Sequence, residues 1–178
     1  MDGKERLEKA RKRITESIAQ NIHLYGLPPS AGRQFGMMFF QNKPSTLDDM
    51  ANELGMSKTS MSTSIRALSE AKLVERVWER GVRKDLYEVK EDWYQSFIDT
   101  FTMKWRRSVS IHTAAIRKSV SELEQLIEDE TISSTILEEA KADMERLIYI
   151  KQYYAWLDRL INAFEDHEIF NLVPIEDE

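Results

Sequence analysis

A run of small hydroxyl and basic side chains in the middle of the chain contains the residue types that bind phosphate. In SKTSMSTSIRALSEAK, Met61, Ile65 and Leu68 recur at helical spacing and predict the buried face of a helix that Ser57 caps. The opposite face has no acidic residue before Glu70. Hydroxyls, cations and a helix N-terminus bind phosphate oxygens, and arginine or lysine also binds guanine edges. The residues expected to face outward are Lys58, Thr59, Ser62, Thr63 and Arg66.

A basic hairpin is predicted directly after this helix. In LVERVWERGVRKDLYEV, two β-prone runs flank a charged segment with Gly81, which places Arg80, Arg83 and Lys84 at the tip. Each feature alone has an ordinary explanation, since hydroxyls cap helices and charged tips are usually just solvated. Their order (helix, glycine turn, hydroxyl-rich helix, basic hairpin) is typical of a winged helix-turn-helix that reads duplex DNA. The tip would suit a neighbouring minor groove or the DNA backbone.

Long helices are expected to position this unit. Apolar spacing predicts one helix over about 5–25, a second that ends at about residue 42, and a third over 47–54. A Thr46–Asp49 capping box opens the third helix, and Gly55 ends it. Further helices are predicted over 91–129 and 134–166, before a loose tail over 171–178. The expected fold is mainly α, a winged helix-turn-helix with a two-stranded wing and long N- and C-terminal dimerisation helices. The expected division is a dimerisation helix (1–27), a DNA-binding domain (28–90) and a helical dimerisation and sensing region (91–178).

Charge is distributed unevenly along the chain. The net charge of −6 argues against a nucleic-acid partner, but residues 119–178 contain only four basic residues and sixteen acidic ones. The rest of the chain is therefore net positive, as expected if one end meets phosphate. The alternative is a winged helix used only for protein–protein assembly, which the acidic composition would suit. That alternative predicts exposed apolar residues on the helix face where Lys58 and Arg66 are expected.

Catalytic, metal and membrane functions find no support in the sequence. Cysteine is absent, and His23, His112 and His167 lie far apart without a metal-ligand spacing. There is no phosphate-cradling glycine loop of the P-loop type and no nucleophile elbow. No window approaches the roughly 18 apolar residues of a membrane span. We therefore expect a cytoplasmic protein without enzymatic activity, cofactor, metal or membrane partner.

Two stretches, LYGLPPSAGRQFGMMFF and TLDDMANELGMSKTSMSTSIRALSEAKLVERVWERGVRKDLYEV, resemble the MarR-type winged-helix regulators. Within them the chain looks most like the branch of the choline-responsive repressor of glycine betaine synthesis genes (GbsR-like), from about residue 14 to 118. The resemblance implies a homodimeric repressor of genes for osmoprotectant uptake or synthesis. It also implies a pseudo-palindromic operator, with recognition helices about 34–36 Å apart. By this likeness, the outward residues of helix 58–70 and the wing tip contact the DNA.

An aromatic stripe supplies a candidate ligand site. Rings recur every four residues in the helix predicted from residue 91, and ring faces attract quaternary ammonium cations such as choline or glycine betaine. A stripe with this spacing is more often a core or a dimer interface. The candidate cage comprises Phe39, Trp93, Phe97, Phe101 and Trp105.

Five basic residues of the same predicted helix need a partner. They could touch DNA, but we expect them to pair with the acidic last helix of the same or a partner subunit. They are Lys104, Arg106, Arg107, Arg117 and Lys118.

Overall fold

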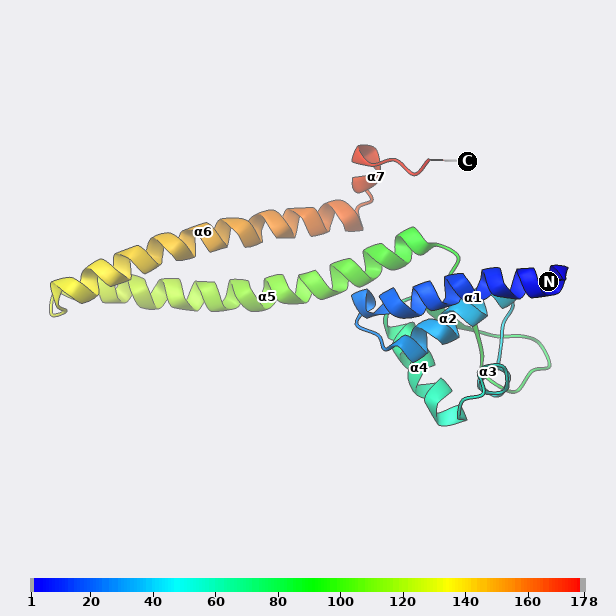
Figure 1. The fold of residues 1–178 in the computed structure, drawn as a ribbon. Coiled ribbons are helices and arrows are strands. Elements are labelled where there is room, and N and C mark those ends of the chain that lie inside the picture. The colour runs from blue at the N-terminus through cyan, green and yellow to red at the C-terminus, as the bar shows by residue number, and fades with distance from the viewer. Residues whose placement is uncertain (1, 177–178) are drawn as a thin grey trace. The chain divides into compact units, whose positions relative to one another are not determined.

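The computed structural model describes residues 2–176 and divides the chain into two compact units, Met1–Thr100 and Phe101–Glu178 (Figure 1). The first unit contains the helices α1 (Gly3–Asn21), η1 (Ile22–Tyr25, a 3-10 helix), α2 (Pro29–Gln41), α3 (Leu47–Leu54) and α4 (Lys58–Glu70). The strands β1 (Val74–Val77) and β2 (Leu86–Val89) and the start of α5 (Trp93–Glu128) complete it. The second unit contains the rest of α5, α6 (Ser134–Glu165) and α7 (Ile169–Leu172). The expected mainly α fold with a winged helix is confirmed, whereas the functional division at residues 27 and 90 stays a prediction.

Two details differ from the sequence expectations. The first α-helix ends at Asn21, and the chain continues as a 3-10 turn before Gly26 adopts a left-handed conformation with φ of 77°. The prediction of a loose tail was wrong for Asn171 and Leu172, which belong to α7. There the backbone N–H of Val173 donates to the carbonyl of Ile169 at 2.8 Å and closes the turn. The last two residues of the predicted tail, 177–178, lie outside the described residues.

Local side-chain caps define the helix-turn-helix. The predicted capping box is present at α3, where the Thr46 hydroxyl accepts from the backbone N–H of Asp49 at 3.2 Å and the Asp49 carboxylate accepts in return at 3.0 Å. Gly55 then ends the helix at φ of 62°, in the left-handed region that favours glycine. The Ser57 hydroxyl caps α4 by accepting from the backbone N–H of Ser60 at 3.1 Å. These short-range contacts fix where the second helix of the motif begins.

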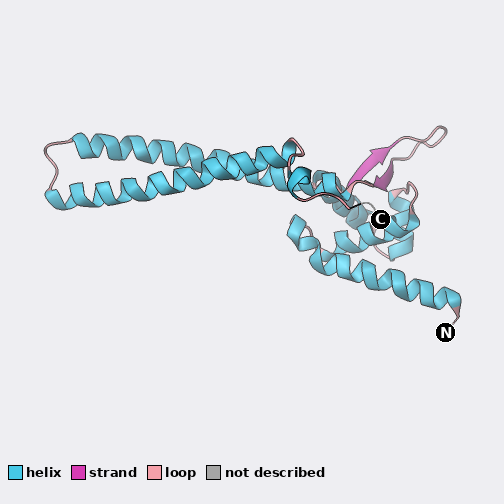
Figure 2. Ribbon diagram, turned by 90° about the horizontal axis from the view of Figure 1, so that it is seen from above, coloured by secondary structure: helices cyan, strands magenta, loops and turns pink. Residues whose placement is uncertain are grey.

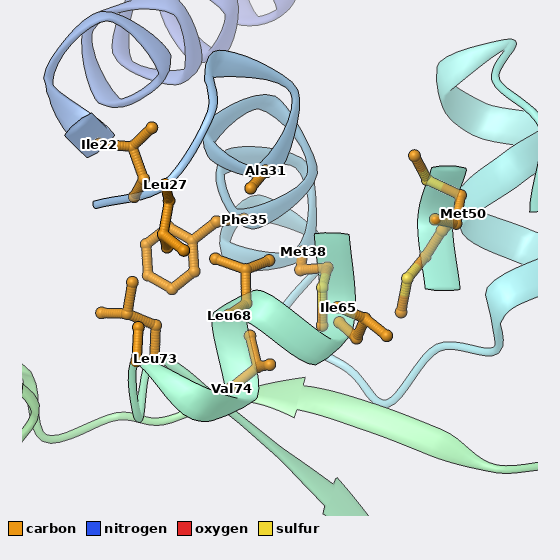
Figure 3. Close-up of a cluster of buried hydrophobic side chains, with 12 residues drawn as sticks. Ile22, Leu27, Ala31, Phe35, Met38, Met50, Ile65, Leu68, Leu73 and Val74 are labelled. Carbon is orange, nitrogen blue, oxygen red and sulfur yellow. The ribbon is translucent and has the colours of Figure 1, made fainter. Parts of the chain in front are cut away.

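One apolar core holds α4 in place. Met61, Ile65 and Leu68 are all buried, as their spacing predicts, and they pack in the same cluster as Met38 of α2 and Met50 of α3 (Figure 3). Burying an aliphatic side chain of this size contributes about 1.5–3 kcal/mol. The apolar face of α4 is therefore committed to the core, and its other face is left outward.

The wing is a two-stranded antiparallel sheet with one extra bridge. Val74 pairs with Val89 and Val77 with Leu86 (Figure 2). Ser45, just before α3, forms a bridge to Tyr87 with two backbone hydrogen bonds of 2.9 and 3.0 Å. The wing is thereby attached to the segment that leads into the helix-turn-helix.

The end of α4 is tied to the start of α5. The Thr100 hydroxyl donates to the carbonyl of Ala71 at 2.7 Å, and the Ser96 hydroxyl donates to the carbonyl of Lys72 at 2.9 Å. Both hydroxyl side chains are buried. They satisfy carbonyls at the helix end that have no partner within the helix itself.

The second unit is an antiparallel helical hairpin in which α6 runs back along α5 (Figures 1 and 2). Val109, Leu157 and Ile161 form its buried core. Arg106 also crosses between the two helices, with guanidinium contacts of 2.7 Å to Asp158 and 2.6 Å to Glu165. The expected pairing with the acidic last helix is therefore present for Arg106 within one chain, while Lys118 faces Glu122 of its own helix at 3.8 Å.

Candidate nucleic-acid interface

The outward face of α4 presents the predicted polar residues. Lys58, Thr59, Thr63 and Arg66 are exposed, and Ser62 is half-buried. The Thr63 hydroxyl donates to the carbonyl of Thr59 one turn earlier at 3.1 Å, which still leaves its oxygen able to accept. This face carries hydroxyls and cations and none of the exposed apolar residues that a pure assembly module requires.

The wing tip presents the second predicted group. Arg80, Arg83 and Lys84 are all exposed in the loop between β1 and β2. Gly81 has φ of 90°, which an L side chain rarely adopts, so this position requires glycine for the tight turn. Arg66, Arg80 and Arg83 form no ion pair with any residue between 2 and 176, and their guanidinium groups can bind an external anion.

A carboxylate that the sequence analysis missed joins the two groups. Asp48 of α3 contacts Lys58 at 2.8 Å through Oδ1 and Lys84 at 2.7 Å through Oδ2. The hydrogen bonds from Lys58 and Lys84 lower the pKa of the Asp48 carboxyl to about 2, so this group is ionised at neutral pH. The hydrogen bond to Asp48 raises the pKa of Lys84. The structure thus brings together one cation from α4 and one from the wing, 26 residues apart in the sequence.

Two further wing residues were also missed. Trp78 follows β1 and its side chain is 80% exposed, although tryptophan is normally among the more buried residues. The guanidinium of Arg76 lies 5.0 Å from the centre of the Trp78 ring and also pairs with Asp85. A tryptophan beside a basic hairpin tip is visible in the sequence, but its exposure follows only from the fold.

The described ring contacts of the predicted cage residues fall into two groups, one in each unit. Phe39 and Trp93 contact each other with ring centres 5.3 Å apart, and Phe35 contacts the same Trp93 at 5.6 Å. Phe101 contacts Trp105 at 6.2 Å and Phe164 of α6 at 4.8 Å, in the second unit. The fifth residue, Phe97, is about half exposed between them in the sequence.

An apolar cavity of about 170 Å³ lies beside the first aromatic group. Of the five predicted cage residues, Trp93 lines it. Tyr25 and Phe35 supply two more rings, which the sequence analysis did not select. The complete lining is Ile18, Asn21, Ile22, Leu24, Tyr25, Phe35, Leu73 and Trp93.

Metal clusters and membrane-spanning helices are both absent from the part of the chain that the structure describes. Residues 2–176 contain no cluster of three or more histidine, cysteine or acidic side chains that could hold a metal ion. Over the same residues, no helix combines the length and the apolar character that crossing a bilayer requires.

Comparison with known proteins agrees with this geometry. Residues 93–171 match the C-terminal helical hairpin of GbsR family transcriptional regulators. The chain is 38% identical to the HTH-type transcriptional repressor OpcR of Bacillus subtilis (strain 168) over 168 residues, which covers 94% of this chain and 91% of that protein. It is 35% identical to the HTH-type transcriptional repressor GbsR of the same organism over 170 residues, covering 96% and 94%.

A solved structure supports the fold. The crystal structure of a transcriptional regulator that is 16% identical aligns with a TM-score of 0.56 over 89% of this chain and 98% of that one. At this identity the likeness concerns the fold alone. The resemblance drawn from the sequence motifs is confirmed by the two repressors and the matching hairpin. The chain belongs to the GbsR family of transcriptional regulators, and it is a DNA-binding regulator and not an enzyme.

Proposed function

We propose that this chain is a homodimeric, cytoplasmic repressor that places α4 in the major groove of a pseudo-palindromic operator, with the wing on the adjacent backbone or minor groove. The likeness to the choline-responsive branch supports genes for osmoprotectant uptake or synthesis as its targets. A quaternary ammonium osmolyte is the proposed effector. Both curated relatives described above are repressors, which supports repression here.

The observation that carries the DNA-binding role is the composition of the outward face of α4. Its apolar side is buried, and the exposed side offers Lys58, Thr59 and Arg66 from the first three turns. In a recognition helix, arginine and lysine side chains can reach base edges, and hydroxyls and lysines also bind phosphates. The proposed wing contacts are Arg80, Arg83 and Lys84.

Operator binding tests this proposal. Genomic footprinting of the protein would identify bound promoters and thereby the regulated pathway. On the strongest site, Arg66→Ala should weaken binding by about 1–3 kcal/mol if the guanidinium reads a base. Lys141→Ala, which removes an exposed cation of α6, is the matched control and should leave affinity unchanged. Equal effects of the two substitutions, or an affinity that does not fall with salt, would favour the assembly role instead.

Homodimerisation is supported by apolar side chains that one chain leaves exposed on α6. Tyr149 is 74% exposed, and Tyr153 and Trp156 lie on the same side of the helix at positions i+4 and i+7. A contiguous exposed aromatic surface marks an interaction site. Sedimentation equilibrium of the full chain should give twice the chain mass, and Tyr149→Glu with Trp156→Glu should shift it to the monomer. A monomeric wild-type chain would contradict the dimer.

The effector site is proposed at the cavity lined by Trp93. A cavity of roughly 150 Å³ holds benzene in another protein, so about 170 Å³ suits a ligand of similar size, a class that includes choline. The rings of Tyr25, Phe35 and Trp93 can attract a quaternary ammonium group through their faces. Phe39 contacts the Trp93 ring, whereas the lining of this cavity does not include Phe97, Phe101 or Trp105. Their untested cage roles form the alternative location of the site.

Thermal shift with choline and glycine betaine tests the effector site. Choline should raise the melting temperature of the wild type, Trp93→Ala should abolish that rise, and Trp105→Ala should preserve it. A rise that survives Trp93→Ala but is lost in Trp105→Ala would move the site to the second aromatic group. No rise with either compound would remove this ligand class.

A further inference from the structure

The carboxylate of Asp48 forms ion pairs with two lysines of the proposed DNA interface, one from α4 and one from the wing. Asp48 lies in the first turn of α3, and each of its oxygens accepts from a different ammonium group, Lys58 at 2.8 Å and Lys84 at 2.7 Å. The contacts are at the surface, with side chains 61% and 64% exposed for the lysines and 36% for Asp48. Water and an approaching duplex can therefore reach all three groups.

A DNA phosphate needs the same ammonium groups that Asp48 holds. Carboxylate and phosphate oxygens are equivalent partners for a charged N–H donor. With both lysines free, this part of the interface has a charge of +2, and with Asp48 present it has +1. Exposed lysine–carboxylate pairs are weak, so phosphates can displace Asp48 from the lysines. The displaced carboxylate would then lie beside a negatively charged backbone.

We infer that Asp48 is an affinity-setting residue of the DNA interface, which competes with DNA phosphates for Lys58 and Lys84. The inference rests on the proposed role of these two lysines in DNA binding. Phosphate contacts carry no sequence information, so Asp48 lowers affinity for any duplex.

A salt series on a fluorescently labelled random-sequence duplex tests the inference without knowledge of the operator. Asp48→Asn should bind more tightly than the wild type. Because one more positive charge faces phosphate, the slope of log affinity against log salt should steepen by about 0.9. The advantage of Asp48→Asn should therefore shrink about 3.5-fold between roughly 50 and 200 mM salt. The Thr46–Asp49 capping box is left in place, so α3 keeps its N-terminal cap.

A charge-matched control separates local competition from net charge. Glu53→Gln changes the net charge by the same amount on the same helix, and Glu53 is exposed and forms no ion pair among residues 2–176. Its effects on affinity and on the salt slope should be smaller than those of Asp48→Asn. Equal effects of the two substitutions would overturn the inference.

Removing both lysines provides the second test. In a Lys58→Ala, Lys84→Ala background, Asp48→Asn should gain no more affinity than Glu53→Gln does there. An undiminished gain would show that Asp48 repels DNA directly, and the competition would be refuted. If the wild type bound no duplex at any salt concentration, the proposed function and this inference would both fail. If the wild type binds and only the comparison with Glu53→Gln fails, the proposed function stands.

Discussion

The close approach of α1 and α2 predicts an unusual response to a glycine-to-alanine change. A Cβ atom added at Gly32 of α2 would lie 2.5 Å from the Cα of Ala19, 3.0 Å from its N and 3.1 Å from the Cγ2 of Ile22. Carbon atoms pack best at about 3.5–4.0 Å. Ala19 and Ile22 are both buried, so neither can turn aside. The helices would have to separate by about 1 Å.

Two opposing terms decide the sign of this change. Alanine is favoured over glycine in a helix interior by about 1 kcal/mol, whereas overpacking a dense core costs about 1–3 kcal/mol. The closest contact is with a backbone atom, which places the overpacking cost at the upper end of that range. Gly32→Ala should therefore lower the free energy of unfolding by about 1–2 kcal/mol.

Urea unfolding followed by circular dichroism measures this difference. Gly3→Ala is the matched control, because a Cβ there meets nothing within 4 Å, and it should leave stability unchanged or slightly higher. Since the overlapping Ala19 atoms are backbone, Ala19→Gly should not rescue Gly32→Ala. If Gly32→Ala proved as stable as Gly3→Ala, the close approach of the two helices would be refuted.

Three further substitutions have defined outcomes. Lys72 follows the end of α4 with φ of 60°, within a pair of backbone hydrogen bonds that usually involves glycine. Lys72→Gly should therefore raise the free energy of unfolding by about 1 kcal/mol, and a lower midpoint in urea would contradict this. Gln34 is fully buried, and its Oε1 accepts no hydrogen bond among the described residues. Gln34→Met should therefore also raise the free energy of unfolding by about 1 kcal/mol. A lower free energy of unfolding in the same urea assay would indicate that the Nε2 contacts of Gln34 matter more. Because Lys58 and Lys84 depress the pKa of Asp48, its contribution to stability is complete above its ordinary value of 3.8 and is lost as pH falls toward about 2. The free energy of unfolding should therefore fall less steeply with decreasing pH in Asp48→Asn than in the wild type over that range. Identical pH dependence in the two proteins would argue against the ion pairs of Asp48 with Lys58 and Lys84.

Local signals in the sequence were sufficient for the helix-turn-helix. The Thr46–Asp49 box, Gly55 and the Ser57 cap each act over three or four residues, so the printed sequence contains both partners of each contact. The burial of Met61 and Leu68 likewise follows from helical spacing. Since the inward face was predictable, the outward residues of α4 were predictable as its complement.

Contacts between distant segments were not predictable in the same way. Asp48 and Lys84 are 36 residues apart, and Ala19 meets Gly32 across two helices. The four-residue aromatic period placed Trp93 and Trp105 on one stripe, and Phe39 was added from another helix. Periodicity gives direction around a helix and no distance between elements. The structure describes contacts of Phe39 with Trp93 and of Phe101 with Trp105, and the single cage stays a prediction.

The sequence by itself determined the long helices, the winged helix-turn-helix and the outward face of α4 that we propose meets DNA, because these depend on short-range capping and on hydrophobic period. Only the tertiary structure decided that Lys58 and Lys84 share one carboxylate, that Trp78 lies exposed on the wing and that Trp93 lines a cavity. Each of these depends on how separate elements pack, and packing is set by the complementary shapes of side chains that no local pattern specifies.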